Sequence, residues 1–136
     1  MDRRELCLVQ NSFVNVFLQK TRVSHCFYER LFQISPDART LFSGDLTVQG
    51  EKLMATLALV VKNLDQFDCL RPAIARLARD HKRYGARKEH YDQAGEALIW
   101  ALGQVLGDAF DPPTEAAWRR AYGQVAAAMV PVPEDG

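Results

Sequence analysis

The feature that most constrains the fold of this chain is the spacing of its apolar residues. In six stretches they recur every three or four positions, and no stretch shows the strict alternation of apolar and polar residues that predicts a half-buried strand. The stretches cover residues 6–17, 23–34, 53–64, 70–78, 91–105 and 118–129. We therefore expect an all-α fold of six or seven helices with no strand.

Prolines, glycines and capping residues predict where several of these helices begin and end. Pro36 should end the second helix, and Gly107 should end the fifth. Pro72 suits the first turn of the fourth helix, where its missing N–H costs nothing. The last helix is entered through residues 111–114, where either Asp111 or Thr114 is a suitable N-cap.

The chain should form one domain. Its 136 residues are close to the commonest domain size, and we find no linker or internal repeat. We assign residues 1–136 to that domain, with a short polar tail from about residue 131 that contains Pro133. An all-α chain of this size is either a bundle or a set of crossed helices around a pocket. The unequal helix lengths and the break at residues 43–45 favour crossed helices.

Charge and cysteine content limit the classes of partner. Seventeen basic residues balance seventeen acidic ones, which gives no electrostatic reason to bind nucleic acid or an anionic membrane. No stretch approaches the roughly 20 apolar residues of a membrane span, and the charged residues 2–5 do not resemble a secretion signal. Three widely spaced cysteines predict neither a disulfide framework nor a zinc site. We expect a cytoplasmic protein with no nucleic-acid or membrane partner.

His81 differs from the other two histidines in its position. It follows Leu77 by four residues and Ala78 by three, which places it on the apolar face of the fourth predicted helix, in the last turn. One interpretation is a packed histidine or a favourable charge at the helix end. The other is a ligand that points into a pocket. Periodicity alone favours the first interpretation.

Eight further features occur in a characteristic order: 27–32, 36–42, Gln49, His81, 84–85, 90–91, 105–110 and 117–123. In these residues, from about 13 to 129, the chain resembles the bacterial single-domain globins of the Vitreoscilla haemoglobin type and the globin module of flavohaemoglobins. The resemblance implies a globin fold of six to eight helices around a haem pocket. It also reverses the interpretation of His81, which becomes the proximal ligand of the haem iron.

The resemblance further implies a set of haem contacts. A CxxCH motif is absent, so the haem b should be held non-covalently. Phe42 matches the phenylalanine that wedges the haem, Leu53 and Tyr84 belong to the contact set, and Lys52 would pair with a propionate. His81 would be the only metal ligand from the protein.

Residues on both sides of the haem follow from the same resemblance. On the proximal side, Tyr91 and a carboxylate of the last helix would support the ligand histidine; by count the carboxylate is Glu134, although two prolines should end the helix before it. On the distal side, Tyr28, Gln49 and Leu53 match the gas-binding set. Gly50, beside Gln49, should let two helices approach closely.

The resemblance leaves three functions to consider, and no catalytic residue is assigned. The first is reversible binding of O₂, with NO and CO as related ligands, for oxygen storage or transport. The second is detoxification of nitric oxide as a dioxygenase, which would need electrons from a separate reductase. The third is a haem-based or haem-less sensor or interaction module. We expect a monomer or a weak homodimer.

Overall fold

Six α-helices form the framework of the part of the protein that the structure describes. The computed structural model describes residues 1–41, 44–83 and 88–129, and those ranges contain no strand. The helices are α1 (Arg3–Leu18), α2 (Lys20–Ile34), α3 (Leu46–Lys62), α4 (Arg71–Arg83), α5 (Lys88–Leu106) and α6 (Pro112–Met129). Three short 3₁₀ helices connect them: η1 (Pro36–Leu41), η2 (Leu64–Leu70) and η3 (Gly107–Ala109). The all-α prediction is confirmed.

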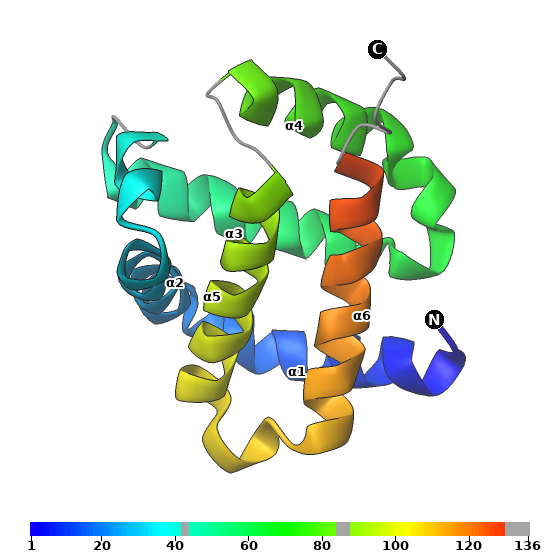
Figure 1. The fold of residues 1–136 in the computed structure, drawn as a ribbon. Coiled ribbons are helices and arrows are strands. Elements are labelled where there is room, and N and C mark those ends of the chain that lie inside the picture. The colour runs from blue at the N-terminus through cyan, green and yellow to red at the C-terminus, as the bar shows by residue number, and fades with distance from the viewer. Residues whose placement is uncertain (42–43, 84–87, 130–136) are drawn as a thin grey trace.

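The helices cross one another. In Figure 1, α5 and α6 run vertically at the front, α3 runs horizontally behind them, and α4 crosses the top. The most extensive contact joins α2 to α5, and α6 packs against both α1 and α4. Crossed helices, rather than a parallel bundle, are therefore the arrangement that the irregular helix lengths predicted.

Side-chain caps explain where three helices begin. Asp2 accepts a hydrogen bond from the Glu5 backbone N–H, 2.8 Å away, and forms a capping box at the start of α1. Asp45 caps α3 by accepting from the N–H of Thr47 at 2.8 Å. Asp111 caps α6 by accepting from the Thr114 N–H at 3.0 Å, so it is the N-cap of the two candidates.

Helix α3 extends beyond the apolar stripe that predicted it. The helix begins at Leu46, whereas the apolar stripe begins at Leu53. Residues 46–52 contain few apolar positions, so their periodicity gives no signal. The Asp45 cap extends the helix over them, and the buried Gly50 docks this first part on α2.

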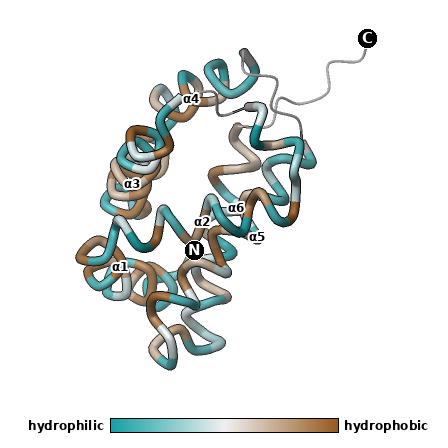
Figure 2. Tube along the Cα trace, turned by 90° about the vertical axis from the view of Figure 1, so that its left-hand side faces the viewer, coloured by the Kyte–Doolittle hydropathy of each residue, from teal (hydrophilic) through white to brown (hydrophobic). Residues whose placement is uncertain are grey.

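The core joins distant parts of the chain. Figure 2 shows apolar and polar segments along the same helices, as expected for helices that each bury one face. Trp118 of α6 is 2% exposed, and its indole N–H donates to the Ser12 hydroxyl of α1 at 2.8 Å.

Among the described residues, no helix combines the length and apolar character that crossing a bilayer requires.

Candidate functional site

His81 lies in the last turn of α4 and is half-buried. Its Nδ1 is 2.8 Å from the carbonyl oxygen of Leu77, one turn earlier. Because a carbonyl oxygen can only accept, Nδ1 must carry the hydrogen, and in the neutral ring Nε2 then has a free lone pair. This hydrogen bond sets both the tautomer and the orientation of the imidazole, which is how proteins prepare a histidine to bind a metal.

Two tyrosines connect the His81 side chain to the rest of the protein. The Tyr91 ring of α5 stacks against the imidazole, with ring centroids 6.1 Å apart and planes 30° from parallel. The hydroxyl of Tyr122, on α6, donates to the Tyr91 backbone carbonyl at 2.5 Å. Burial raises the pKa of Tyr91 and of Tyr122, so both phenols keep their protons at neutral pH. His81 is therefore supported by three helices at once.

Gly95 makes room for this arrangement. A Cβ at that position would lie 2.7 Å from the Tyr122 ring, closer than real side chains pack. The glycine lets α5 approach the aromatic ring of α6 directly, and so places the Tyr122 hydroxyl at the Tyr91 carbonyl. Any larger residue at 95 would displace the ring.

Two stripes of half-buried apolar residues lie on α3 and α4. Leu53 and Leu57 are one turn apart on α3, and Leu77 and Ala78 share the face of α4 that carries His81. In the part of the chain that the structure describes, α3 and α4 are not closely packed against each other. The face of α4 that carries the oriented imidazole is thus apolar and half-covered, with a second such stripe on α3, and surfaces of this kind suit a flat, mostly apolar group with a metal at its centre.

Tyr28 of α2 is the most deeply buried of the predicted distal residues, at 7% exposure. Its ring packs edge-on against Phe27 at 5.0 Å and is stacked on Phe32 at 6.0 Å between centroids. Burial raises the pKa of Tyr28 to about 12, so the phenol is a proton donor across the neutral range.

The predicted close approach of α2 and α3 is present at Gly50. A Cβ there would lie 2.8 Å from the Ser24 hydroxyl oxygen and 4.0 Å from the Tyr28 ring. Gln49, the next predicted distal residue, is half-buried on the same turn of α3, and Lys52 is exposed. The structure thus places Tyr28 next to the turn of α3 that carries Gln49.

Three predicted site residues, Phe42, Tyr84 and Glu134, lie outside the described residues. Within the described part of the chain, no group of three or more His, Cys, Asp or Glu side chains could hold a metal ion. A metal centre built on His81 would therefore have fewer than three such ligands among the described side chains and would rely on the group that carries the metal.

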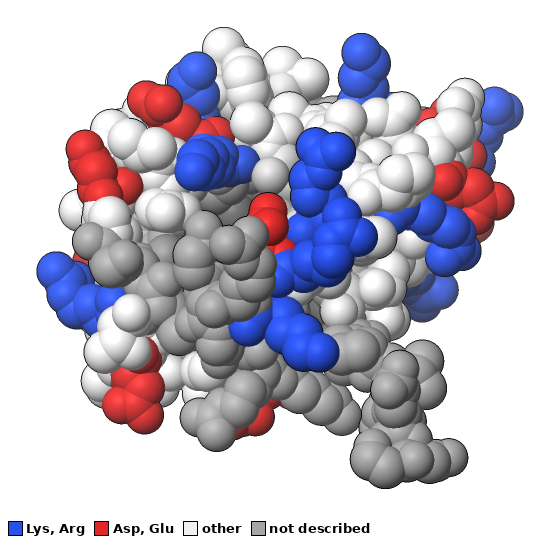
Figure 3. Space-filling model, turned by 90° about the horizontal axis from the view of Figure 1, so that it is seen from above, with Lys and Arg blue, Asp and Glu red and all other residues white. Residues whose placement is uncertain are grey.

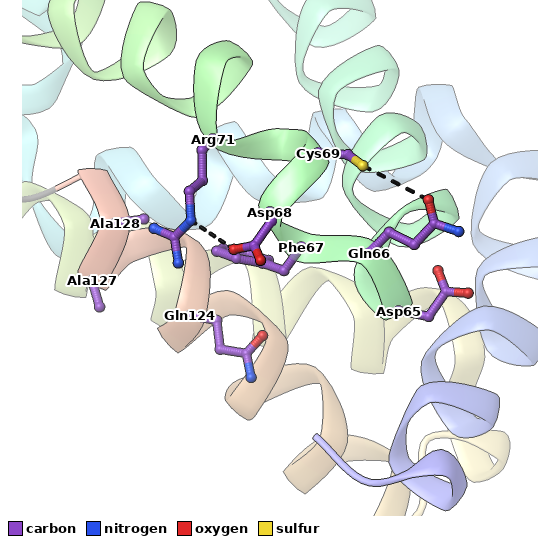
Figure 4. Close-up of a pocket in the computed structure, with 9 residues that line it drawn as sticks. All are labelled: Asp65, Gln66, Phe67, Asp68, Cys69, Arg71, Gln124, Ala127 and Ala128. Carbon is purple, nitrogen blue, oxygen red and sulfur yellow. Dashed lines mark hydrogen bonds and ion pairs between the residues drawn. The ribbon is translucent and has the colours of Figure 1, made fainter.

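A separate cavity of about 720 Å³ lies between η2 and the end of α6 and contains none of the predicted site residues (Figure 4). Arg71 pairs with Asp68 at 2.8 Å in its wall, and Phe67 contributes an aromatic surface. A second cavity, of about 810 Å³, lies between α2 and α3 and reaches Tyr28 and Met54. Neither cavity includes His81.

Sequence reasoning missed two partners of the site. It predicted support for His81 from Tyr91 and from a carboxylate, but not the Leu77 carbonyl that lies 2.8 Å from Nδ1. It also did not predict the hydrogen bond from Tyr122 to the Tyr91 carbonyl. Only the four-residue spacing of Leu77 and His81 could have suggested the first, and no sequence signal indicated the second.

Comparison with known proteins gives a consistent family. The Globin family model matches residues 25–129. A flavohemoprotein of Bacillus subtilis is 32% identical over 114 residues, which are 80% of this chain and 28% of that protein. A flavohemoprotein of Bordetella parapertussis is 33% identical over 107 residues, covering 76% of this chain and 27% of the relative. The chain thus spans little more than a quarter of the length of these relatives.

Solved structures give the same fold. One is an engineered carbene transferase from Rhodothermus marinus whose parent is assigned as a nitric oxide dioxygenase. It has a TM-score of 0.85 and 28% identity, and the match covers 93% of this chain and 89% of that one. A bacterial globin from Campylobacter jejuni matches with a TM-score of 0.80 and 23% identity over 93% of this chain and 91% of the other. The second match concerns the fold alone.

Proposed function

Since this chain belongs to the globin family, we propose that it binds haem b non-covalently through His81 and reversibly binds O₂ and other diatomic gases. The observation that carries the proposal is the hydrogen bond from His81 Nδ1 to the Leu77 carbonyl. It leaves Nε2 as a neutral, oriented ligand on the apolar face of α4. Bound haem supplies an iron with one coordination position for a gas.

The remaining residues have separate tasks in this proposal. The half-buried Leu53, Leu57 and Leu77 would supply apolar contacts to the haem and exclude water. Lys52 is exposed on α3, where it can pair with a propionate. Phe42 and Tyr84 remain predicted haem contacts.

On the distal side we assign the donor role to Tyr28, with Gln49 as its neighbour. A phenol with a pKa of about 12 keeps its proton and donates to a ligand that has gained partial negative charge. Such a hydrogen bond contributes about 1 kcal/mol, which corresponds to a roughly fivefold slower release of the gas. Slow release and high affinity are the expected result.

A second candidate is nitric oxide dioxygenation, which the name of the Rhodothermus marinus neighbour favours. That activity needs electrons for each turnover, and in this proposal a separate reductase delivers them. The group that accepts the hydrogen bond from His81 helps to decide between a gas carrier and a dioxygenase. The Leu77 carbonyl is neutral, whereas a carboxylate partner would push more electron density toward the iron. The neutral partner favours the carrier over the enzyme.

We place this function in a reducing compartment such as the cytoplasm. Cys7 and Cys69 are exposed, and all three cysteines are free. Exposed free thiols persist where glutathione keeps them reduced.

The test is an absorption spectrum of the purified chain after addition of haem, recorded oxidised, reduced and with carbon monoxide. We expect a Soret band that shifts on reduction and again with carbon monoxide. A chain that shows no Soret band after haem addition would overturn the proposal. Nitric oxide consumption separates the candidates: a carrier gives one stoichiometric burst, whereas a dioxygenase with a reductase gives many turnovers.

A further inference from the structure

Helix α4 concentrates positive charge in a chain that is neutral overall. Its thirteen residues include five basic side chains and one acidic one, Asp80, whereas the whole chain has seventeen of each. Arg76, Arg79 and Lys82 are exposed, and no ion pair within the described part of the chain involves them. We call these three residues the basic face.

The basic face lies on the side of α4 away from the haem ligand. Arg79 precedes His81 by two residues, a rotation of about 200° around the helix, and Arg76 precedes it by five, about 140°. Lys82 flanks them at about 100°. Figure 3, which views the molecule from the α4 side, shows Lys and Arg side chains gathered near the middle of this surface.

The same helix therefore presents the proposed iron ligand on one side and unpaired cations on the other. A helix with its side chains is about 10–12 Å across. A partner seated on the basic face would be separated from the His81 imidazole by about one helix diameter.

We propose that the basic face is the docking surface for a protein with an acidic surface that carries a reduced flavin and passes electrons to the haem. This inference rests on the proposed function, because it presumes haem at His81. In each transfer the flavin loses one electron and the ferric iron gains it. Redox partners form small, short-lived interfaces in which complementary charge steers the encounter.

The size of the basic face favours such a protein over other polyanions. From Arg76 to Lys82 the face extends six residues, about 9 Å along the helix. A nucleic acid or an anionic membrane presents a long, continuous array of charge, and the zero net charge of the chain gives it no long-range attraction. A local acidic cluster on a protein matches a local basic one.

The test uses the haem-loaded protein and a flavodoxin of net negative charge as the probe. The test variant is Arg76→Glu/Arg79→Glu, and the matched control is Arg3→Glu/Arg4→Glu, which changes the same charges in exposed residues of α1. Binding is measured by titration calorimetry at several salt concentrations, and reduction of the ferric haem by stopped-flow absorbance.

We expect the α4 variant to weaken flavodoxin binding at least tenfold and to lose most of its salt dependence, while the α1 control stays within twofold of wild type. The inference is overturned if wild type shows no salt-dependent binding, or if both variants weaken binding equally. It is also overturned if the α4 variant loses binding to a DNA duplex or to phosphatidylserine vesicles but not to flavodoxin. If the α4 variant shows a normal Soret band and binds flavodoxin as wild type does, the docking surface is rejected and the proposed function stands. If wild type shows no Soret band, the proposed function is rejected as well.

Discussion

The two sides of the candidate haem site are held in different ways. On the proximal side, hydrogen bonds join His81 to Leu77 and Tyr122 to Tyr91, so directional bonds set the geometry. On the distal side, ring packing against Phe27 and Phe32 and the close approach at Gly50 contribute to the placement of Tyr28.

This difference separates two properties of the protein. Directional bonds fix one orientation, which suits a ligand that must keep hold of a metal. Tyr28 is instead the proposed donor to a bound gas. Changes on the proximal side should therefore affect stability and haem retention, and changes on the distal side should affect the rate of gas release.

The largest expected effect at neutral pH is that of Gly95→Ala on the proximal side. The added methyl group would collide with the Tyr122 ring, and overpacking of this kind costs about 1–3 kcal/mol. Gly123→Ala is the control, because a Cβ there meets nothing within 4 Å and alanine favours the helix by up to about 1 kcal/mol. Urea unfolding should show the first variant destabilised and the second unchanged or more stable. Equal stability of the two would contradict the tight packing at Gly95.

The next effect concerns alkaline pH and the distal tyrosine. The pKa of Tyr28 is raised to about 12 from 10, so the protonated phenol is favoured by folding. Its contribution is complete below pH 10 and is lost as the pH rises toward 12, by about 2–3 kcal/mol in total. The unfolding free energy should fall over that range, and Tyr28→Phe should reduce the fall. An identical pH profile in that variant would show that titration of the buried Tyr28 does not cause the fall in unfolding free energy.

Tyr122→Phe tests the proximal hydrogen bond without changing the shape of the ring. The variant leaves the Tyr91 carbonyl without its donor, which should cost about 1–1.5 kcal/mol of stability. Haem dissociation should also become faster, because Tyr91 stacks on His81. Urea unfolding measures the stability, and transfer of haem to apomyoglobin measures the rate of haem dissociation. A haem-transfer rate equal to that of wild type would show that Tyr122 does not support the ligand.

Tyr28→Phe tests the distal donor and is the smallest of these effects. Loss of a hydrogen bond of about 1 kcal/mol should increase the O₂ dissociation rate roughly fivefold. Haem dissociation should change less than in Tyr122→Phe. Stopped-flow mixing of the O₂-loaded protein with carbon monoxide gives the rate, and an unchanged rate would exclude Tyr28 as the donor.

The sequence predicted the helices well because their apolar periodicity is strong. The apolar stripe of α3 does not show where that helix begins, since residues 46–52 have few apolar positions and the helix there depends on the Asp45 cap and on Gly50. The prediction that Gly50 lets two helices approach closely is confirmed.

The site was predicted less completely than the fold, for a physical reason. His81, Tyr91 and Tyr28 were identified from side-chain identity and resemblance, and the structure brings His81 and Tyr91 together. The acceptor for His81 is a backbone carbonyl, as is the acceptor for Tyr122. Every residue has such a carbonyl, so the amino-acid sequence does not distinguish the ones that matter.

The most direct test of the account is haem titration of His81→Ala beside His25→Ala. His25 is the control because its side chain is 78% exposed and pairs only with the neighbouring Glu29 among described residues. We predict that His81→Ala keeps its helical circular dichroism, loses tight haem binding, and regains a Soret band when imidazole is added. His25→Ala should bind haem as wild type does. Full and tight haem loading of His81→Ala would contradict the account.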